Sequence, residues 1–227
     1  MNDVLIVART RMQQRHICVA GLDLITGELI RLTDHRGTNY SEMAPYQPGE
    51  VWRIDYQAKY GLTRPHVEDV RILHSSLQEP HADIPALLDK HPTLRDGSPR
   101  ELFDGSLTFE PSLGLDGFDD ARTPYLNRRS RIPRCSIELW LTDRFFTKRV
   151  TQRDGQPKTY LVGPPPSPAD VSMKAPYNGF DDPGLILPPG TLVSVSLARW
   201  WRPFGDDPAW DKCHMQLCNV LWRPDRA

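Results

Sequence analysis

Residues 4–34 read VLIVARTRMQQRHICVAGLDLITGELIRLTD, and this stretch carries most of the information about the fold. Three apolar runs, at residues 4–8, 17–20 and 29–32, are separated by a polar, basic link and by a Thr26-Gly27 turn. Runs of about four to eight apolar and β-branched residues that end at turn signals are typical of strands. The stretch therefore predicts three consecutive strands, a meander that begins a sheet.

The same stretch resembles the start of bacterial dual OB-fold domain proteins. In that family a strand leads into a Ser-Arg segment, a Cys-(Ile/Val)-Ala-Gly strand and a Thr-Gly-Glu-Trp-Ile-Arg turn. Here Thr10-Arg11 stands in place of Ser-Arg, Leu29 in place of Trp, and Gln14-Arg15 where the family has Gly-Gly. The similarity covers less than a fifth of the chain. It implies two OB-type barrels in tandem and a nucleic-acid-binding role, without a settled activity.

Two further segments complete the strands that a small barrel needs. In residues 50–56, Trp52, Ile54 and Tyr56 alternate with Val51, Arg53 and Asp55, which is typical of a half-buried strand with Trp52, Ile54 and Tyr56 in the core. Residues 66–73 form a plausible partner strand. Five strands by about residue 74 match the number in an OB barrel.

The rest of the chain predicts short helices and then more strands. Asp83 can cap a helix that runs to Leu88, and residues 98–101 (Ser-Pro-Arg-Glu) form a capping box before a second short helix. Residues 105–134 show no periodicity and are interpreted as a connector. Strands are expected again at residues 135–141, 145–150, 159–162, 191–197 and 213–222.

These patterns predict an all-β protein with short helices, built as two tandem OB-like β-barrels. The first barrel, with its capping helices, is expected to span residues 1–130, and the second barrel residues 131–227. The 22 Pro and 15 Gly of the 227 residues agree with short strands and structured loops.

The charge of the chain limits how it could bind nucleic acid. The net charge is -1, so any such binding must rest on a local basic patch. Most of the 28 basic residues are Arg, and a GC-rich genome is the simplest explanation of that bias. Arg also suits bidentate phosphate contacts and stacking on bases better than Lys does.

The first candidate group of nucleic-acid-binding residues follows from the basic link and the strand after it. On the functional interpretation these side chains contact phosphates beside a barrel face; on the alternative they are solvated and paired with Asp3, Asp23 and Asp34. The resemblance favours the functional interpretation. The candidates are Arg9, Arg11, Arg15, His16, Arg31 and Arg36.

A second candidate group lies between residues 122 and 134, which hold five Arg and Tyr125. Arg beside aromatic rings suits single strands, although a solvated linker balanced by nearby Asp residues explains the cluster equally well. From this region we take Arg128, Arg129 and Arg131 as candidates. Trp201 joins them as a possible stacking platform, whereas Trp52 and Trp222 are expected in the core.

An enzyme is the weaker hypothesis. The chain has no nucleophile elbow, P-loop, dinucleotide fingerprint or zinc-protease motif, so we name no catalytic residue. Glu68-Asp69 with His66, or Asp34-His35, could hold a divalent ion in a metal-dependent enzyme acting on nucleic acid or a nucleotide.

The cysteines do not suggest a metal site or a cofactor. Cys213 and Cys218 lack zinc spacing, and Cys18 and Cys135 are expected to be buried, reduced thiols. We therefore expect neither a bound metal nor a cofactor.

The N-terminus has no signal-peptide pattern and no window of about eighteen apolar residues occurs, which predicts a cytoplasmic protein away from membranes. The sequence thus predicts a nucleic-acid-binding module that favours single strands and performs no chemistry of its own. A protein-interaction module, with exposed Trp residues that anchor a partner, is a third alternative.

Overall fold

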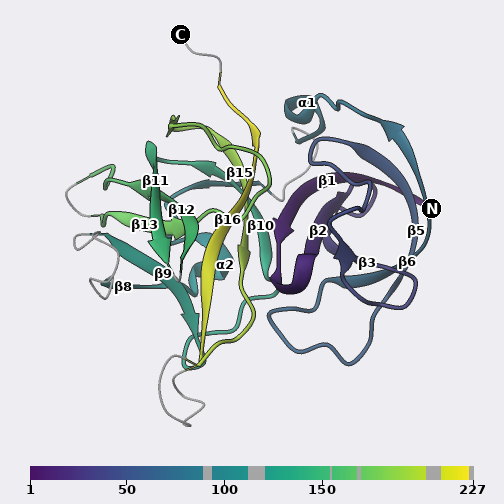
Figure 1. Ribbon diagram of the computed structural model, residues 1–227, viewed down its shortest axis with the longest axis horizontal. Coiled ribbons are helices and arrows are strands. Elements are labelled where there is room, and N and C mark those ends of the chain that lie inside the picture. Colours follow the sequence, from purple (N-terminus) through teal and green to yellow (C-terminus); the bar gives the residue numbers. More distant parts are fainter. Residues whose placement is uncertain (89–93, 112–120, 154, 168–169, 203–210, 225–227) are drawn as a thin grey trace.

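The structure is a computed structural model, and it describes residues 1–88, 94–111, 121–153, 155–167, 170–202 and 211–224 (Figure 1). It is 54% strand and 5% helix, which confirms the predicted all-β class with short helices. None of the helices in the described part of the chain is long and apolar enough to cross a membrane.

The first sheet closes into a five-stranded barrel. Its strands are β1 (Asn2–Arg11), β2 (His16–Asp23), β3 (Leu29–Thr33), β4 (Tyr40–Ser41), β5 (Val51–Ala58) and β6 (Asp69–Glu79), with η1 (Gln13–Arg15) between β1 and β2. The ring runs β1-β2-β3-β6-β5 and returns to β1, while the two-residue β4 pairs with β2. Only β3 and β6 are parallel. The structure thus contains one closed five-stranded β-barrel, with the strand number that the sequence analysis expects for the first barrel.

The inside of the barrel is filled by alternate side chains of its strands. Trp52 and Ile54 lie in this core as predicted, and Tyr56 packs against it, because successive side chains of a strand point to opposite faces. The core residues are Val4, Ile6, Ile17, Val19, Ile30, Leu32, Ala44, Tyr46, Trp52, Ile54, Val70 and Ile72.

The second sheet has ten strands and collects segments from residue 94 to the end of the described chain. Its strands are β7 (Leu94–Gly97), β8 (Thr108–Pro111), β9 (Arg122–Asn127), β10 (Ile137–Thr142), β11 (Phe146–Arg153), β12 (Gln156–Gly163), β13 (Met173–Pro176), β14 (Ile186–Leu187), β15 (Leu192–Leu197) and β16 (Lys212–Trp222). The order is β14-β11-β12-β13-β9-β16-β15-β10-β7, with β8 on β9. Among the described residues these pairings form an open path, so they show one closed barrel and not two.

The change of sheet falls between Glu79 and Leu94, whereas the sequence places the division after residue 130. The stretch interpreted as a connector in fact supplies β8 and β9, because β9 hydrogen-bonds to β16. The second core surrounds Phe103, Trp140 and Phe146, which are fully buried. The two helices are α1 (Ile84–Leu88), where the Asp83 carboxylate accepts from the Ala86 N–H, and α2 (Leu102–Gly105).

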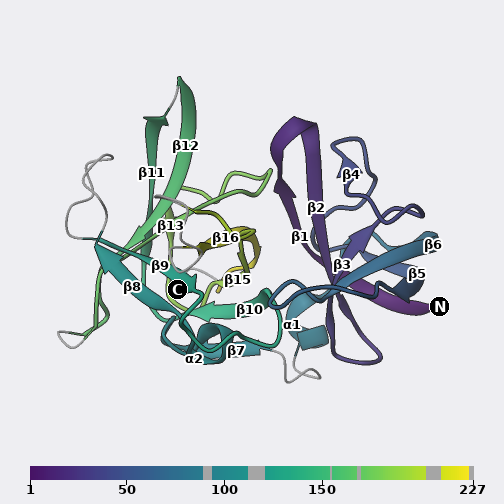
Figure 2. The ribbon, with the colours of Figure 1, turned by 90° about the horizontal axis from the view of Figure 1, so that it is seen from below.

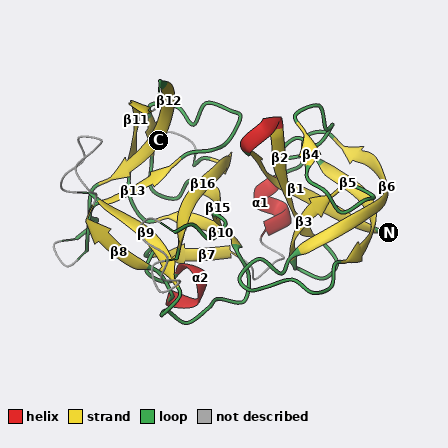
Figure 3. Ribbon diagram, turned by 60° about the horizontal axis from the view of Figure 1, so that its bottom comes forward, coloured by secondary structure: helices red, strands yellow, loops and turns green. Residues whose placement is uncertain are grey.

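The barrel and the second sheet share an apolar interface. The outward side chains of β1 and β2 pack on β10, β15 and β16, and α1 lies between the two halves (Figure 3). Because both faces of β1 and β2 are covered, these strands are buried along most of their length. The shared cluster comprises Leu5, Val7, Ala8, Ala20, Leu22, Val51, Ile84, Ile137, Leu139, Leu192 and Cys218.

Two hairpins, β1–β2 and β11–β12, project from the same side of the molecule (Figure 2). The loop after β13 reaches the first of them: the Arg11 N–H donates to the Asn178 carbonyl at 3.1 Å, and Thr10 forms a β-bridge with Gly179. This loop holds the β1–β2 hairpin against the second sheet.

Candidate nucleic-acid interface

Arg9 and Arg11, on the projecting end of β1, both stack on Phe180. Their guanidinium carbons lie 4.6 and 4.4 Å from the centre of the Phe180 ring. Arg9 also donates to the side-chain oxygen of Gln47 and to the carbonyl of Glu42, and Arg11 donates to the Gly179 carbonyl at 2.6 Å. The guanidinium groups of Arg9 and Arg11, both predicted to contact phosphate, therefore contact the loop after β13 and join the barrel to the second sheet.

Arg15, His16 and Arg36 are exposed. Gln14 and Arg15 have φ of 58° and 59°, in the left-handed region that favours glycine, and these are the positions where the resemblance expects Gly-Gly. Arg36 lies on a separate turn, where the Asp34 carboxylate accepts from the backbone N–H of Arg36 and of Thr38.

Arg31 is enclosed, so its side chain is not part of an exposed basic surface. Only 6% of the residue is exposed, and its guanidinium donates to Glu68 and to Ser136 and forms an ion pair with Asp69 at 3.3 Å. The outward face of β3 carries Arg31 towards the second sheet, where Ser136 lies. The six N-terminal candidates therefore do not form one free basic surface.

The second candidate group is brought together with aromatic residues at one end of β9 and β16. Here Asp211 holds two cations: Arg128 Nε lies 3.0 Å and Arg202 Nε 2.7 Å from its carboxylate oxygens. The hydrogen bond from Arg202 lowers the pKa of Asp211, which keeps the carboxylate ionised. The Arg128 guanidinium also lies 4.9 Å from the Trp200 ring centre, and about half of its side chain is exposed.

Three rings follow one another across this end of the sheet. The ring centres of Trp201 and His214 are 5.5 Å apart. The ring centres of His214 and Tyr125 are 4.8 Å apart, and these two rings meet edge to face. The Lys212 ammonium is 4.7 Å from the Tyr125 ring centre. We call the set Tyr125, Arg128, Trp200, Trp201, Lys212 and His214 the aromatic–basic patch.

Trp201 is the exposed ring of the aromatic–basic patch. Its residue exposure is 50%, and its backbone is fixed by a pair of hydrogen bonds with Lys212, at 2.9 and 2.8 Å. An indole that is held in place and open to solvent loses little freedom when a base stacks on it. The structure thus assigns the exposed position of the Trp200-Trp201 pair to Trp201.

Arg129 and Arg131 are exposed on the turn that follows Arg128. Within the described residues neither side chain forms an ion pair. They extend the positive charge beside the aromatic–basic patch, so the structure brings Arg128, Arg129, Arg131 and Trp201 to one region.

The sequence analysis missed Lys212, His214 and the pairing of Tyr125 with them. The signal was present in β16, where Cys213, Met215 and Leu217 are fully buried and the residues between them face outward. The prediction that Trp222 lies in the core is wrong, because 37% of it is exposed at the far end of β16.

The acidic groups considered for a metal-dependent enzyme serve other purposes. Glu68 and Asp69 bind Arg31, and Asp34 caps its own turn. In the described part of the chain, no three His, Cys, Asp or Glu side chains form a group that could hold a metal ion.

Comparison of the chain with protein-family models, with curated proteins and with solved structures gave no match. The similarity to dual OB-fold domain proteins therefore stays a prediction, and the arguments about function rest on the geometry described above.

Proposed function

We propose that the protein binds single-stranded nucleic acid at the aromatic–basic patch, without chemistry of its own. The observation that carries the proposal is the half-exposed Trp201, whose ring lies next to His214 and whose backbone pairs with Lys212. Single-strand-binding proteins combine aromatic rings, on which bases stack, with basic groups that follow the phosphates.

The distribution of charge supports this location. Arg128 stacks on Trp200, and the exposed Arg129 and Arg131 follow it in the chain. Arg31 in contrast is enclosed, and Arg9 and Arg11 stack on Phe180. Outward-facing strand surfaces are the usual binding face of an OB barrel, but here the second sheet covers β1 and β2. The binding site that we propose therefore belongs to the second sheet and not to the barrel.

Substitution of the exposed indole tests the proposal. We expect Trp201→Ala to weaken binding of a fluorescently labelled single-stranded oligonucleotide by about tenfold or more, because stacking of one base contributes about 1–3 kcal/mol. Fluorescence anisotropy, with DNA and RNA probes at two salt concentrations, provides the measurement. Binding should weaken as salt rises, since phosphate contacts release counterions.

Trp222→Ala is the matched control. Like Trp201, Trp222 is a partly exposed Trp, but it lies at the other end of β16. It is ten residues from Lys212, the partner of Trp201, which is about 33 Å along a strand. We expect this variant to bind as the wild type does. The proposal would be contradicted if the two variants lost the same oligonucleotide affinity, or if the affinity of the wild type did not change with salt concentration.

A further inference from the structure

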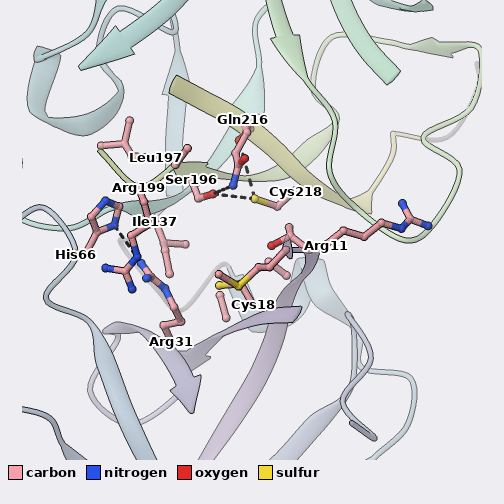
Figure 4. Close-up of a pocket in the computed structure, with 15 residues that line it drawn as sticks. Arg11, Cys18, Arg31, His66, Ile137, Ser196, Leu197, Arg199, Gln216 and Cys218 are labelled. Atoms are coloured by element: carbon pink, nitrogen blue, oxygen red, sulfur yellow. Dashed lines mark hydrogen bonds between the residues drawn. The ribbon is translucent and has the colours of Figure 1, made fainter. Parts of the chain in front are cut away.

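A cavity of about 70 Å³ lies between the barrel and the second sheet (Figure 4). Its walls come from the outward faces of β1, β2 and β3 and from β15 and β16. Pockets that bind drug-sized ligands measure about 300–1,000 Å³, and one water molecule of the liquid takes up about 30 Å³. The cavity therefore suits a group of a few heavy atoms.

Positive charge gathers at one side of this cavity. Arg31 and Arg199 both line it, and both pair with Asp69, at 3.3 and 3.6 Å. Figure 4 shows their side chains beside His66, whereas the Arg11 side chain extends away towards its own partner, the Gly179 carbonyl. No carboxylate is among the described residues that line the cavity.

The surrounding charges do not cancel. Glu68 and Asp69 face three cations, namely Arg31, Arg199 and Lys59, so one positive charge is left over. Burial raises the pKa of the Cys18 thiol, and that of Cys218 to about 12, so these two lining thiols carry no negative charge. The cavity is therefore electrostatically suited to an anion.

Two buried nitrogens at this site lack hydrogen-bond acceptors. Arg31 Nε and His66 Nε2 have no partner, and 97% of His66 is buried. His66 Nδ1 lies 3.4 Å from Arg31 Nη2, and the His66 ring also takes part in a backbone hydrogen bond with Ala198. Burial, reinforced by the charges of Arg31 and Arg199, lowers the pKa of His66 to about 3, so the ring is neutral. Unsatisfied buried donors are costly, and an acceptor ligand would satisfy them.

We propose that this cavity binds a phosphate group, held by Arg31 and Arg199 beside the His66 ring. A phosphate offers the acceptor oxygens and the negative charge that these donors require, and guanidinium groups match its geometry. The same chemistry is presented by inorganic phosphate and by the terminal phosphate of an oligonucleotide. A whole nucleotide exceeds the cavity, so only the phosphate itself would enter it.

The test uses the full-length protein with ¹³C-labelled histidine rings, and its probe is inorganic phosphate at constant ionic strength. We expect a saturable shift of the His66 ring signals, which His66→Gln assigns. Arg199→Gln should weaken this binding by about tenfold or more, because one charged hydrogen-bonding partner is lost. Because 55% of the Arg199 side chain is exposed, we expect the variant to fold, and thermal unfolding checks this.

Arg100→Gln is the matched control, because Arg100 is also half exposed and pairs with one partly buried carboxylate, Asp170, at 3.5 Å. It should bind phosphate as the wild type does. The proposal is overturned if the His66 signals do not shift saturably, or if Arg100→Gln and Arg199→Gln lose the same affinity.

A second arm identifies the source of the phosphate. A short oligonucleotide with a 5′-phosphate that shifts the His66 signals at lower concentration than inorganic phosphate indicates a terminal phosphate; the reverse order indicates the free ion. The same oligonucleotide with a 5′-hydroxyl should leave His66 unchanged, and a shift with that probe would count against the proposal. None of these measurements depends on Trp201. The proposal for the cavity and the proposal for the aromatic–basic patch can therefore be refuted independently of each other.

Discussion

Arg31 and Arg128 are both strand-associated arginines, and their spatial neighbours give them different roles. Arg31 alternates with Ile30 and Leu32, which lie in the barrel core, so its side chain leaves the barrel on the outside. That outside is covered by the second sheet, and Ser136 and Glu68 bind the guanidinium there. Arg128 lies at an open end of the second sheet and keeps about half of its side chain exposed.

The enclosed position of Arg31 predicts a large effect on stability. We expect Arg31→Met to lower the free energy of unfolding by about 3–5 kcal/mol, because Glu68 would remain buried without its cation. Urea denaturation at neutral pH measures the change. Arg53→Met is the control, since the Arg53–Asp3 pair is exposed and its loss should leave the urea midpoint nearly unchanged. Similar losses for both would contradict this account.

Among the elements, the loop after β13 joins parts of the chain that are far apart in sequence. It brings Phe180 between the barrel arginines and the second sheet, and it crosses β16 at Gly179. A Cβ atom on Gly179 would lie 2.2 Å from the Cys218 carbonyl oxygen and 2.6 Å from the Tyr177 hydroxyl. The close approach of two backbones therefore requires glycine here.

We expect Gly179→Ala to destabilise the protein by about 1–3 kcal/mol or more, since the neighbouring backbone must move to admit a methyl group. Thermal unfolding followed by circular dichroism measures this. Leu185→Ala, a truncation of a largely exposed side chain further along the same segment, should change little. A Gly179→Ala protein as stable as the wild type would show that the loop does not cross β16 as closely as described.

For the molecule as a whole, the shared apolar interface couples the barrel to the second sheet. Leu5 and Val7 of β1 pack in one cluster with Leu139 of β10, and all three are fully buried. Separation of the two halves would expose this cluster to water, which costs about 25 cal/mol for each Å² of apolar surface. The described chain should therefore unfold as one cooperative unit.

Leu139→Ala tests this coupling. We expect a loss of about 2–5 kcal/mol, with a single transition in which tryptophan fluorescence and circular dichroism coincide. Leu77→Ala, on the exposed part of β6, should leave the transition in place. Two separate transitions in urea, with Leu139→Ala moving only one of them, would show that the halves unfold independently.

Much of the local structure could be predicted from sequence, because alternation and turn residues act between near neighbours. The first three strands, β5 and α1 occur where the patterns place them, and Trp52 and Ile54 lie in the core. β8 and β9 could not be predicted, because β9 is stabilised by pairing with β16, about ninety residues away. For the candidate site, Trp201 and Arg128 are candidates from local sequence clusters, whereas Lys212 and His214 need the strand pairing that brings them to Tyr125.

The sequence by itself determined the all-β class, the opening meander and the supply of arginines and tryptophans, since these depend on residue type and short-range periodicity. Only the tertiary structure decided which arginines are free, because burial depends on what covers each strand face. It enclosed Arg31, placed Arg9 and Arg11 on Phe180, and left Trp201 half exposed beside His214. It also created the phosphate-sized cavity, whose walls come from strands of both sheets that no local pattern connects.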